Sequence, residues 1–286
     1  MEFFRSSILL AIVAFVAGAA SPLRADDKIK IAIASDSTAA TWRSPRPERG
    51  WGQYLTEYFD SQVSVENFAK PGASTKTFIA EGLWAKAIGS RPGFILIQFG
   101  HNDSHTPDHP EHTDPDGLYT DLLRRFVKEA RAAGATPILI TPVARRTAED
   151  TLIPYVDAMK KVAGETDAEV IDLHRLSQEL YVRLGQDVQQ KVGAQQGDLT
   201  HFNEVGARMI AGIVADELGS YALVLGQHRR GARISNGVGP LGTATRCDLN
   251  KFCPKRLVTR VGESDGDCLR ARCDRRDRNG PKPYIG

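Results

Sequence analysis

Cysteine is absent from the first 246 residues of this 286-residue chain, and all four cysteines lie between Cys247 and Cys273. No thiol can therefore take part in chemistry performed by the larger part of the chain. Long hydrophobic runs are equally scarce. Apart from the stretch Ile8–Ala20, no segment approaches the roughly 20 apolar residues that a helix needs to cross a bilayer. No internal repeat is evident either.

The apolar stretch near the amino terminus has the layout of an export signal. Arg5 precedes it, and small residues and the step Leu23-Arg24-Ala25 follow it before a charged segment begins. This order predicts a secretory signal peptide over residues 1–25, too short to span a bilayer as a stable helix. The alternative, a buried core helix, does not account for the charged and small-residue flanks. We therefore expect a secreted or periplasmic protein without membrane insertion.

Charge divides the rest of the chain unequally. The formal net charge is +2, but residues 227–286 carry +8 and the preceding 226 residues carry −6. Hydrophobic periodicity also ends near Gly226, which predicts a domain over 26–226 and a separate tail over 227–286.

The tail holds all four cysteines, so in an exported chain two disulfides are feasible, with three connectivities that the sequence does not rank. The cysteine spacings match no familiar zinc pattern, which makes metal the lesser interpretation. We expect the tail to be disordered or disulfide-linked, and its charge suits contact with an anionic surface.

Between Lys28 and Leu218, apolar runs of strand length alternate with amphipathic stretches, the pattern of an α/β fold with a mainly parallel sheet. The expected strands are 29–34, 63–68, 94–99, 137–141 and 169–173, and the expected helices are 50–59, 75–88, 118–133, 153–165 and 203–218. Gly134 and Gly164 are expected helix stops. The sequence thus predicts a three-layer α/β/α sandwich around a five-stranded, flavodoxin-like sheet.

Two long irregular stretches, 38–49 and 101–117, follow the first and third expected strands. Loops of that length in a compact domain are usually functional. Both would leave the carboxyl edge of the sheet, where open parallel sheets bind ligands. Ser37 lies at the start of the first of them, and taken alone a Ser in this context is more often a turn or helix-capping residue.

Four segments in order change that interpretation: Ser35-Asp36-Ser37-Thr38, Asn67-Phe68-Ala69-Lys70-Pro71-Gly72-Ala73-Ser74, Gly100-His101-Asn102-Asp103 and Asp198-Leu199-Thr200-His201. Together they resemble the four sequence blocks of the SGNH or GDSL hydrolase superfamily. The segments Gly50-Trp51-Gly52-Gln53, Gln98-Phe99-Gly100-His101-Asn102-Asp103 and Asp198-Leu199-Thr200-His201-Phe202-Asn203 look like those of rhamnogalacturonan acetylesterases. The resemblance covers residues 29–218.

This resemblance and the chemistry of the residues agree. Ser37 would attack an ester carbonyl, His201 would accept its proton, and Asp198, three residues earlier, would orient the imidazole. The N–H groups of Ser37 and Gly72 and the side-chain amide of Asn102 would stabilise the oxyanion. The resemblance implies catalysis without a metal, and we expect no cofactor.

One residue departs from the block. Ser35 stands where the superfamily usually has Gly. If that position required a positive φ or close packing under the loop, a Ser there would be strained by about 1 to 2 kcal/mol. We then expect altered or lowered activity at most, because the residues assigned to catalysis are intact.

The second long loop alternates His and acidic residues, namely His101, His105, His109 and His112 with Asp103, Asp108, Glu111 and Asp114. Such a set suggests metal ligands, but Pro107 and Pro110 disfavour the helix that would align them, and no zinc-site pattern is visible. We expect a solvated, substrate-facing loop without a metal, with His101 among the substrate-binding residues.

Aromatic and basic residues in the first loop suggest a sugar ligand. Trp42 is a candidate substrate-binding platform, whereas Trp51 is more typical of core packing. Arg43, Arg46 and Arg49 could pair with the uronate carboxylates of pectin, although a plain solvated loop explains them slightly better.

The sequence therefore predicts an exported serine esterase that removes O-acetyl groups from pectic polysaccharide, with rhamnogalacturonan indicated by the resemblance alone. Its partner would be an acetylated polysaccharide, and no nucleic-acid partner is expected. One alternative is a GDSL esterase, lipase or thioesterase with another short-chain acyl substrate. Another is a non-catalytic carbohydrate-binding protein on the same scaffold.

Overall fold

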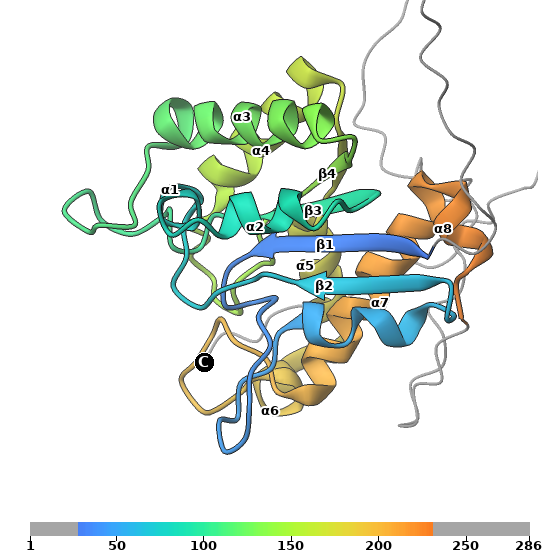
Figure 1. Ribbon diagram of the computed structural model, residues 1–286. Helices are drawn as coiled ribbons and strands as arrows, with labels where there is room; N and C mark the ends of the chain where they lie inside the picture. The colour runs from blue at the N-terminus through green and yellow to red at the C-terminus, as the bar shows by residue number, and fades with distance from the viewer. Residues whose placement is uncertain (1–27, 231–286) are drawn as a thin grey trace, which may run out of the picture. The chain divides into compact units, whose positions relative to one another are not determined.

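The computed structural model describes residues 28–230 of the chain. Within them, five strands form one parallel sheet in the order β2-β1-β3-β4-β5 (Figure 1). The strands are β1 (Ile29–Ser35), β2 (Val63–Asn67), β3 (Phe94–Gln98), β4 (Thr136–Ile140) and β5 (Glu169–Ile171). This is the flavodoxin-like order, so the predicted fold class is confirmed.

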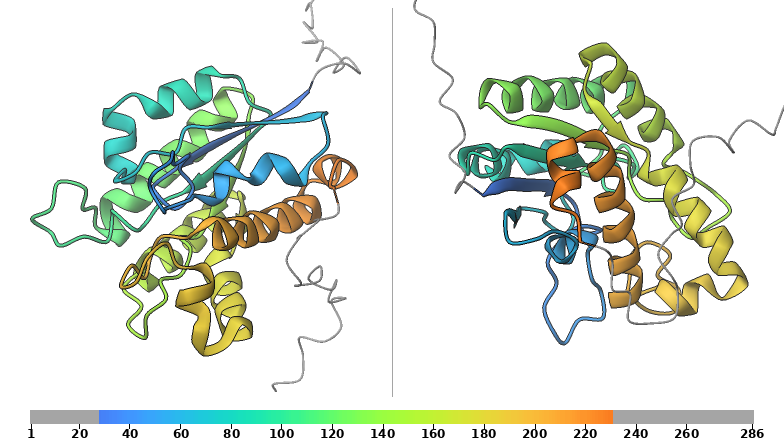
Figure 2. Two further views of the ribbon diagram at one scale, coloured as in Figure 1. Left: turned by 90° about the horizontal axis from the view of Figure 1, so that it is seen from below. Right: turned by 90° about the vertical axis from the view of Figure 1, so that its right-hand side faces the viewer.

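Helices cover both faces of the sheet, as Figures 1 and 2 show. The helices on one face are α1 (Thr75–Ala80), α2 (Leu83–Gly89), α3 (Thr120–Ala132) and α4 (Ile153–Thr166). Those on the other are α5 (Leu173–Leu184), α6 (Val188–Val192), α7 (Glu204–Tyr221) and α8 (Leu223–Gln227). The result is the expected three-layer sandwich.

The alternation of side chains along β1 shows how the sheet separates two cores. Ile31 and Ile33 belong to the core on the α7 side, whereas Ala32 and Ala34 belong to the core on the α3 side. All four are fully buried, as expected for a strand covered on both faces. The two small alanines pack in the core that also holds Phe78 and Phe99. The ring centroids of these phenylalanines lie 5.1 Å apart in an edge-to-face arrangement.

Several helix predictions were wrong in detail. The expected helix 50–59 is two short 3₁₀ turns over Trp51–Gln53 and Leu55–Tyr58, and the expected helix 75–88 is broken at Gly82, whose φ is +71°. Gly134 follows α3 with φ of +82°, as expected of a helix stop, but Gly164 lies inside α4. The sequence analysis missed α5, α6 and α8, of which α6 and α8 are only about a turn long.

The domain extends past the expected boundary at Gly226. Nδ1 of His228 lies 3.0 Å from Oδ2 of Asp60, and the Arg229 guanidinium forms an ion pair with Asp216. The predicted signal peptide, the basic tail and its four cysteines lie outside the described residues. Within residues 28–230, no helix has both the length and the apolar character needed to span a membrane.

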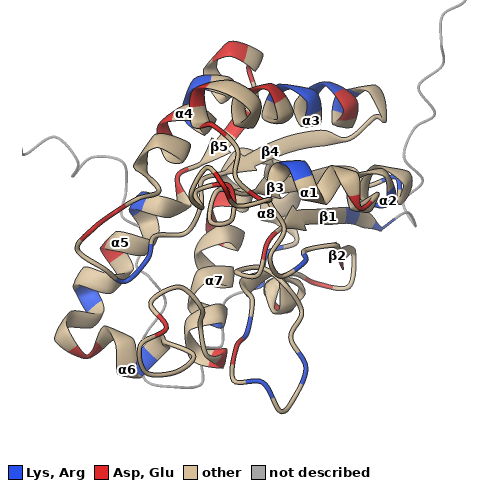
Figure 3. Ribbon diagram, turned by 90° about the vertical axis from the view of Figure 1, so that its left-hand side faces the viewer, with Lys and Arg blue, Asp and Glu red and all other residues tan. Residues whose placement is uncertain are grey.

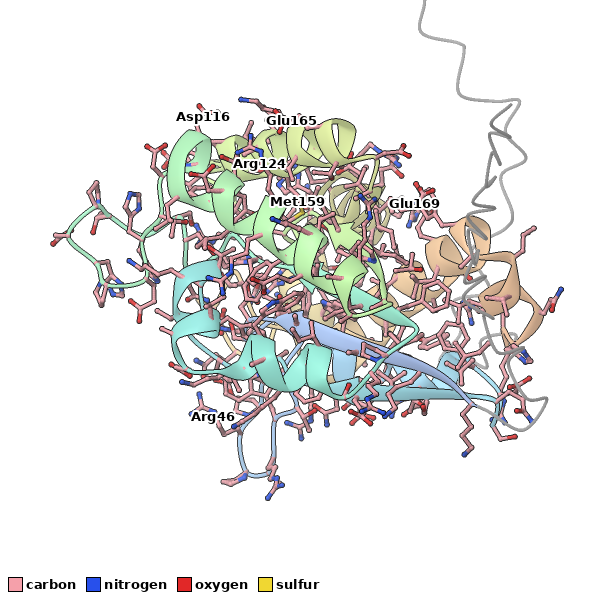
Figure 4. All side chains as sticks on the ribbon, turned by 45° about the horizontal axis from the view of Figure 1, so that its top comes forward. Arg46, Asp116, Arg124, Met159, Glu165 and Glu169 are labelled. Atoms are coloured by element: carbon pink, nitrogen blue, oxygen red, sulfur yellow. The ribbon has the colours of Figure 1, made fainter. Side chains whose placement is uncertain are left out.

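Charged residues are found mainly in the helices and loops, while the strands carry few of them (Figure 3). Figure 4 shows one such cluster, in which Arg124 of α3 points toward Glu165 of α4; its Nη2 lies 2.8 Å from the carboxylate. Exposed pairs of this kind contribute less than about 1 kcal/mol each, so the two helices are held chiefly by their buried faces.

Candidate active site

Ser37 lies just beyond the carboxyl end of β1. The last residue of the strand, Ser35, is in register with Gln98 of β3, so residues 36 and 37 leave the sheet at its carboxyl edge. Ser37 is largely buried but remains accessible to solvent, with 8% of the residue exposed. A parallel sheet thus presents this hydroxyl at the edge where such folds bind ligands.

A buried chain of hydrogen bonds fixes the turn that carries Ser37. Thr38 donates through its backbone N–H (2.9 Å) and its hydroxyl (2.7 Å) to Oδ1 of Asp36. Gln98 Nε2 in turn donates to the Thr38 hydroxyl at 2.6 Å, and the Trp51 indole donates to Gln98 Oε1 at 2.8 Å. Because all these groups are buried and paired, each holds its neighbour in one orientation. This is a physical role for the Trp51 and Gln98 segments noted in the sequence.

The same turn is closed from the other side by Gly50. A Cβ placed on Gly50 would lie 2.3 Å from the Ala40 carbonyl oxygen and 2.4 Å from both the Ala39 carbonyl carbon and the Ala40 nitrogen. Only glycine permits two backbone segments to approach this closely. The two ends of the loop 38–49 therefore meet where the backbone of Gly50 contacts that of Ala39 and Ala40.

Ser37, His201 and Asp198 form a continuous hydrogen-bonded relay. Ser37 Oγ lies 2.9 Å from His201 Nε2, and His201 Nδ1 lies 2.8 Å from Asp198 Oδ2. The other carboxylate oxygen of Asp198 accepts the backbone N–H groups of Thr200 (2.9 Å) and His201 (2.8 Å). These are the distances that a nucleophile, a base and an orienting carboxylate require.

The electrostatics of Asp198 suit an orienting role. Partial burial acts to raise the pKa of its carboxyl, but hydrogen bonds from the backbone of His201 and Thr200 and from the His201 ring outweigh burial and lower the pKa below its usual value. The carboxylate therefore stays ionised and can accept a hydrogen bond from a protonated Nδ1 of His201.

Arg146, which the sequence analysis missed, anchors the loop that carries Asp198 and His201. Its Nη2 donates to the backbone carbonyls of Asp198 (2.8 Å) and His201 (2.7 Å), and its Nε donates to Gln189 Oε1 (2.7 Å). The guanidinium also lies over the Phe202 ring, 4.9 Å from the centroid. One side chain thus holds both ends of the Asp-x-x-His segment. The only feature of the sequence that could have indicated this role is the pair Arg145-Arg146, which follows the buried strand β4 by a few residues.

Each of the three groups expected to stabilise an oxyanion has an N–H that bonds to no other described residue. The backbone N–H groups of Ser37 and Gly72 make no hydrogen bond to any other residue in the described part of the chain. Gly72 has φ of +80°, and a Cβ there would meet nothing within 4 Å, so its surroundings are open. Asn102 Nδ2 donates to the Ala73 carbonyl at 2.9 Å, which orients the amide and leaves its second N–H unused.

Trp42 is next to the catalytic candidates. Its indole N–H donates to the Ser37 carbonyl at 3.0 Å, and its ring lies edge-on to the His201 imidazole at 6.0 Å between centroids. Arg46, in the same loop (Figure 4), lies over the Trp42 ring with its Cζ 4.7 Å from the ring centroid. The half-buried indole therefore forms part of the wall beside His201.

His101 does not face the substrate side as expected. The residue is only 4% exposed, and its Nδ1 lies 3.4 Å from Oδ2 of the fully buried Asp36. Burial acts to raise the pKa of Asp36, but the facing His101 and the hydrogen bonds from Thr38 lower it below its usual value. The histidine follows directly after the fold's third strand and Gly100, which carries it inward beneath the Ser37 turn. Its side chain therefore packs against Asp36, the residue before Ser37.

The rest of the His-rich loop is exposed and internally paired. The rings of His105 and His109 stack at 4.2 Å between centroids, and His112 Nδ1 lies 2.7 Å from the His105 carbonyl oxygen. Within residues 28–230, no three His, Cys, Asp or Glu side chains are grouped so as to hold a metal ion.

Ser35 is not strained in the way the sequence suggested. It is the last residue of β1, fully buried, and is not among the non-glycine residues with positive φ. Ser35 lowers the stability of the fold for another reason. Its buried hydroxyl has no hydrogen-bond partner among the described residues. A buried, unpaired hydroxyl destabilises the fold by about 1 to 3 kcal/mol.

The family of the chain follows from comparison with known proteins. Residues 36–209 match the model of the GDSL-like Lipase/Acylhydrolase family, and the chain belongs to this family of carboxylic-ester hydrolases. It is 36% identical over 223 residues to the rhamnogalacturonan acetylesterase RhgT of Bacillus subtilis, a match covering 70% of this chain and 94% of RhgT.

Two further comparisons extend this result. The chain is 33% identical over 205 residues to YesY of Bacillus subtilis, a probable rhamnogalacturonan acetylesterase, with 68% of this chain and 94% of YesY covered. The crystal structure of Axe2, an acetylxylan esterase from Geobacillus stearothermophilus, shares the fold with a TM-score of 0.54 at 23% identity, over 68% of this chain and 95% of Axe2.

Proposed function

We propose that this protein is an exported serine esterase that removes O-acetyl groups from pectic polysaccharide, with Ser37, His201 and Asp198 as its catalytic triad. The observation that carries the proposal is the continuous chain of hydrogen bonds from Ser37 Oγ through His201 to Asp198. The backbone N–H groups of Ser37 and Gly72, which bond to no other described residue, support it. The fold alone would not support a specific activity, because one fold hosts many functions.

The reaction proceeds in two steps. His201 Nε2 takes the proton of Ser37 as its Oγ attacks the acetyl carbonyl, and Asp198 stabilises the imidazolium that results. The negative charge on the tetrahedral intermediate is met by the N–H groups of Ser37 and Gly72 and by the Asn102 amide. His201 then donates its proton to the departing sugar hydroxyl, which leaves an acetyl group on Ser37.

Water completes the cycle. His201 deprotonates a water molecule that attacks the acetyl-Ser37 carbonyl, the same donors stabilise the second oxyanion, and acetate leaves as Ser37 recovers its proton. The surface near the triad suits a sugar leaving group, since Trp42 offers an aromatic wall beside His201.

The proposed substrate rests on the relatives. RhgT and YesY are named for rhamnogalacturonan deacetylation and align over nearly their whole length with this chain. The proposed export rests on the amino-terminal sequence Met1–Ala25, with its charged start, apolar centre and small-residue end.

The deciding experiment is acetate release from acetylated rhamnogalacturonan by the wild type and by Ser37→Ala. We expect release by the wild type and a loss of several orders of magnitude in the variant, because removal of a triad nucleophile leaves only binding and oxyanion stabilisation. Acetylated xylan and a long-chain ester serve as comparison substrates. Absence of release from every acetylated glycan would refute the proposal, and full activity in Ser37→Ala would refute the role of Ser37.

A further inference from the structure

Arg145 lies between the two halves of the candidate active site. Its Nη2 donates to the backbone carbonyl of His101 at 3.3 Å, one residue before Asn102, and its Nη1 donates to the Thr151 hydroxyl at 2.7 Å. The next residue in the chain donates its backbone N–H to the Leu199 carbonyl at 2.9 Å, within the loop that carries the catalytic base. Arg145 is thus bordered by an oxyanion donor on one side and by the base loop on the other.

The charge of Arg145 has no direct counter-ion. No carboxylate among the described residues lies within 4 Å of its guanidinium, and the carboxylates of Asp150 and Asp36 affect it only from a greater distance. Both are already engaged: Asp150 Oδ2 lies 2.8 Å from His174 Nε2, and Asp36 is held by Thr38 and His101. Arg145 is half-buried, and this burial lowers the pKa of its guanidinium.

Other arginines near the site are engaged with protein groups, buried or exposed. Arg146 donates from Nη2 and Nε to two backbone carbonyls and Gln189, and its Nη1, which has no partner among the described residues, is buried away from solvent. In the loop 38–49, Arg46 is paired with Glu48 at 2.9 Å and Arg49 donates to two carbonyl groups, while Arg43 is exposed. Of the three loop arginines that the sequence offered for uronate binding, Arg43 and Arg46 are exposed, and Arg49 is half-buried with its Nη1 bound to carbonyl groups of its own loop.

We propose that Arg145 binds the carboxylate of a uronate sugar in the substrate, and so makes the enzyme selective for acidic over neutral acetylated polysaccharides. The guanidinium has five N–H donors, of which two are used, and its planar fork matches a carboxylate. The bond to the His101 carbonyl is long at 3.3 Å, so this donor is readily given to a ligand. This inference rests on the proposed function, whose substrate class it specifies.

The test compares one acetylated rhamnogalacturonan oligosaccharide with the same oligosaccharide after its carboxyl groups have been reduced to alcohols and its acetyl groups restored. For Arg145→Gln, we expect the ratio of kcat/KM for the acidic over the reduced substrate to fall at least tenfold. Arg145→Lys should keep part of the ratio, because it retains the charge but not the fork.

Arg131→Gln is the matched control. Like Arg145, Arg131 makes two hydrogen bonds to protein oxygens, in its case the carbonyls of Thr166 (2.7 Å) and Asp167 (2.8 Å). It lies in the last turn of α3, away from the carboxyl ends of the strands. This variant should keep the wild-type ratio. An unchanged ratio in Arg145→Gln, or an equal loss on both substrates, would overturn the proposal.

A binding measurement separates this inference from the proposed function. Calorimetric titration of Ser37→Ala with the acidic and the reduced oligosaccharide reports carboxylate binding without turnover. If Ser37→Ala/Arg145→Gln binds the acidic oligosaccharide more weakly than Ser37→Ala does, and both variants bind the reduced oligosaccharide equally, the role of Arg145 is supported. This holds whatever substrate the wild type hydrolyses. Equal binding in the presence and absence of Arg145, combined with normal acetate release by the wild type, would refute the inference and leave the proposed function intact.

Discussion

The two halves of the candidate active site are supported in different ways. Ser37 follows directly from β1, on a turn held by the buried network of Asp36, Thr38, Gln98 and Trp51. His201 belongs to a loop between α6 and α7, and its side chain is 28% exposed. The proposed nucleophile thus takes its position from the sheet. The loop of the proposed base is held by the side chains of Arg146 and Gln189 together with backbone bonds such as the one from the Arg146 N–H to the Leu199 carbonyl.

This difference determines how each half should respond to substitution. A change beneath Ser37 disturbs buried polar pairs that belong to the core, so its effect should appear first in stability. A change in the support of His201 leaves the core intact but lets the base move, and a misplacement of about 1 Å in a catalytic group can cost a hundredfold in rate.

The largest effect is expected from Arg146→Met. Methionine can occupy part of the space over Phe202 but makes none of the three hydrogen bonds of the guanidinium. We expect kcat to fall about a hundredfold with little change in KM, because the base is misplaced while substrate contacts remain. Steady-state kinetics with a short acetate ester measures this.

Arg146→Lys supplies the control for that prediction. Lysine retains the charge and can reach one carbonyl, so partial recovery of kcat is expected, together with a melting temperature close to that of Arg146→Met. If kcat is unaffected in the methionine variant, the loop does not depend on Arg146 and the proposed contrast between the halves is wrong.

A pH-dependent effect on stability is expected from Asp103, on the nucleophile side. This carboxyl is fully buried, and burial raises its pKa to about 6 despite hydrogen bonds from Thr75 and Thr113. Between pH 4 and 6 the folded state therefore holds a proton that the unfolded state has lost, so the contribution of Asp103 to stability decreases as pH rises through this range. A change of two pKa units amounts to about 2 to 3 kcal/mol.

The comparison of wild type with Asp103→Asn isolates this contribution, because other carboxyls such as Asp36 and Asp198 have lowered pKa values and act in the opposite direction. Urea unfolding at intervals from pH 4 to 7 gives the difference in free energy. We expect the variant to gain stability relative to the wild type as pH rises. A constant difference across this range would contradict the raised pKa.

The smallest effect is expected at Ser35, also on the nucleophile side. Ser35→Ala removes a buried hydroxyl without a partner and should stabilise the fold by about 1 kcal/mol. Ser35→Gly should be less stable than the alanine variant by about 0.5 to 1 kcal/mol, because glycine in a strand is costly. Thermal unfolding of the pair measures both, and a rise in turnover specific to the glycine variant would restore the idea that Ser35 limits the enzyme.

Much of the fold was predictable because its signals are local. Each buried strand is a short apolar run, and the resulting order of strands and helices specifies a parallel sheet. The 3₁₀ turns after Gly50 were not predictable, since their apolar residues have helical spacing and only contact with Ala39 and Ala40 forces the tighter path. The sequence pattern did not predict α5. The expected strand 169–173 runs two residues past the end of β5 and so includes Leu173, the first residue of α5.

In the site, residues were predictable where the role lies in their own chemistry. Ser37, Asp198 and His201 stand out as a nucleophile, an orienter and a base, and the structure brings them together. Arg146 and His101 act through position, one across a loop and the other beneath a turn. Nothing in an isolated Arg-Arg or Gly-His step tells which carbonyl or carboxylate the folded chain will place opposite it.

The closed base of the loop 38–49 has a consequence for how this enzyme could diversify. Because Gly50 meets Ala39 and Ala40 directly and the Arg49 N–H donates to the Phe202 carbonyl, both ends of this arm are fixed, and only its exposed tip, residues 43–47, is left to vary. Trp42 stays near the base of the arm, tied to the Ser37 carbonyl. Evolution, or a protein engineer, can therefore exchange the tip of the arm to suit another polymer while the reaction centre is inherited unchanged.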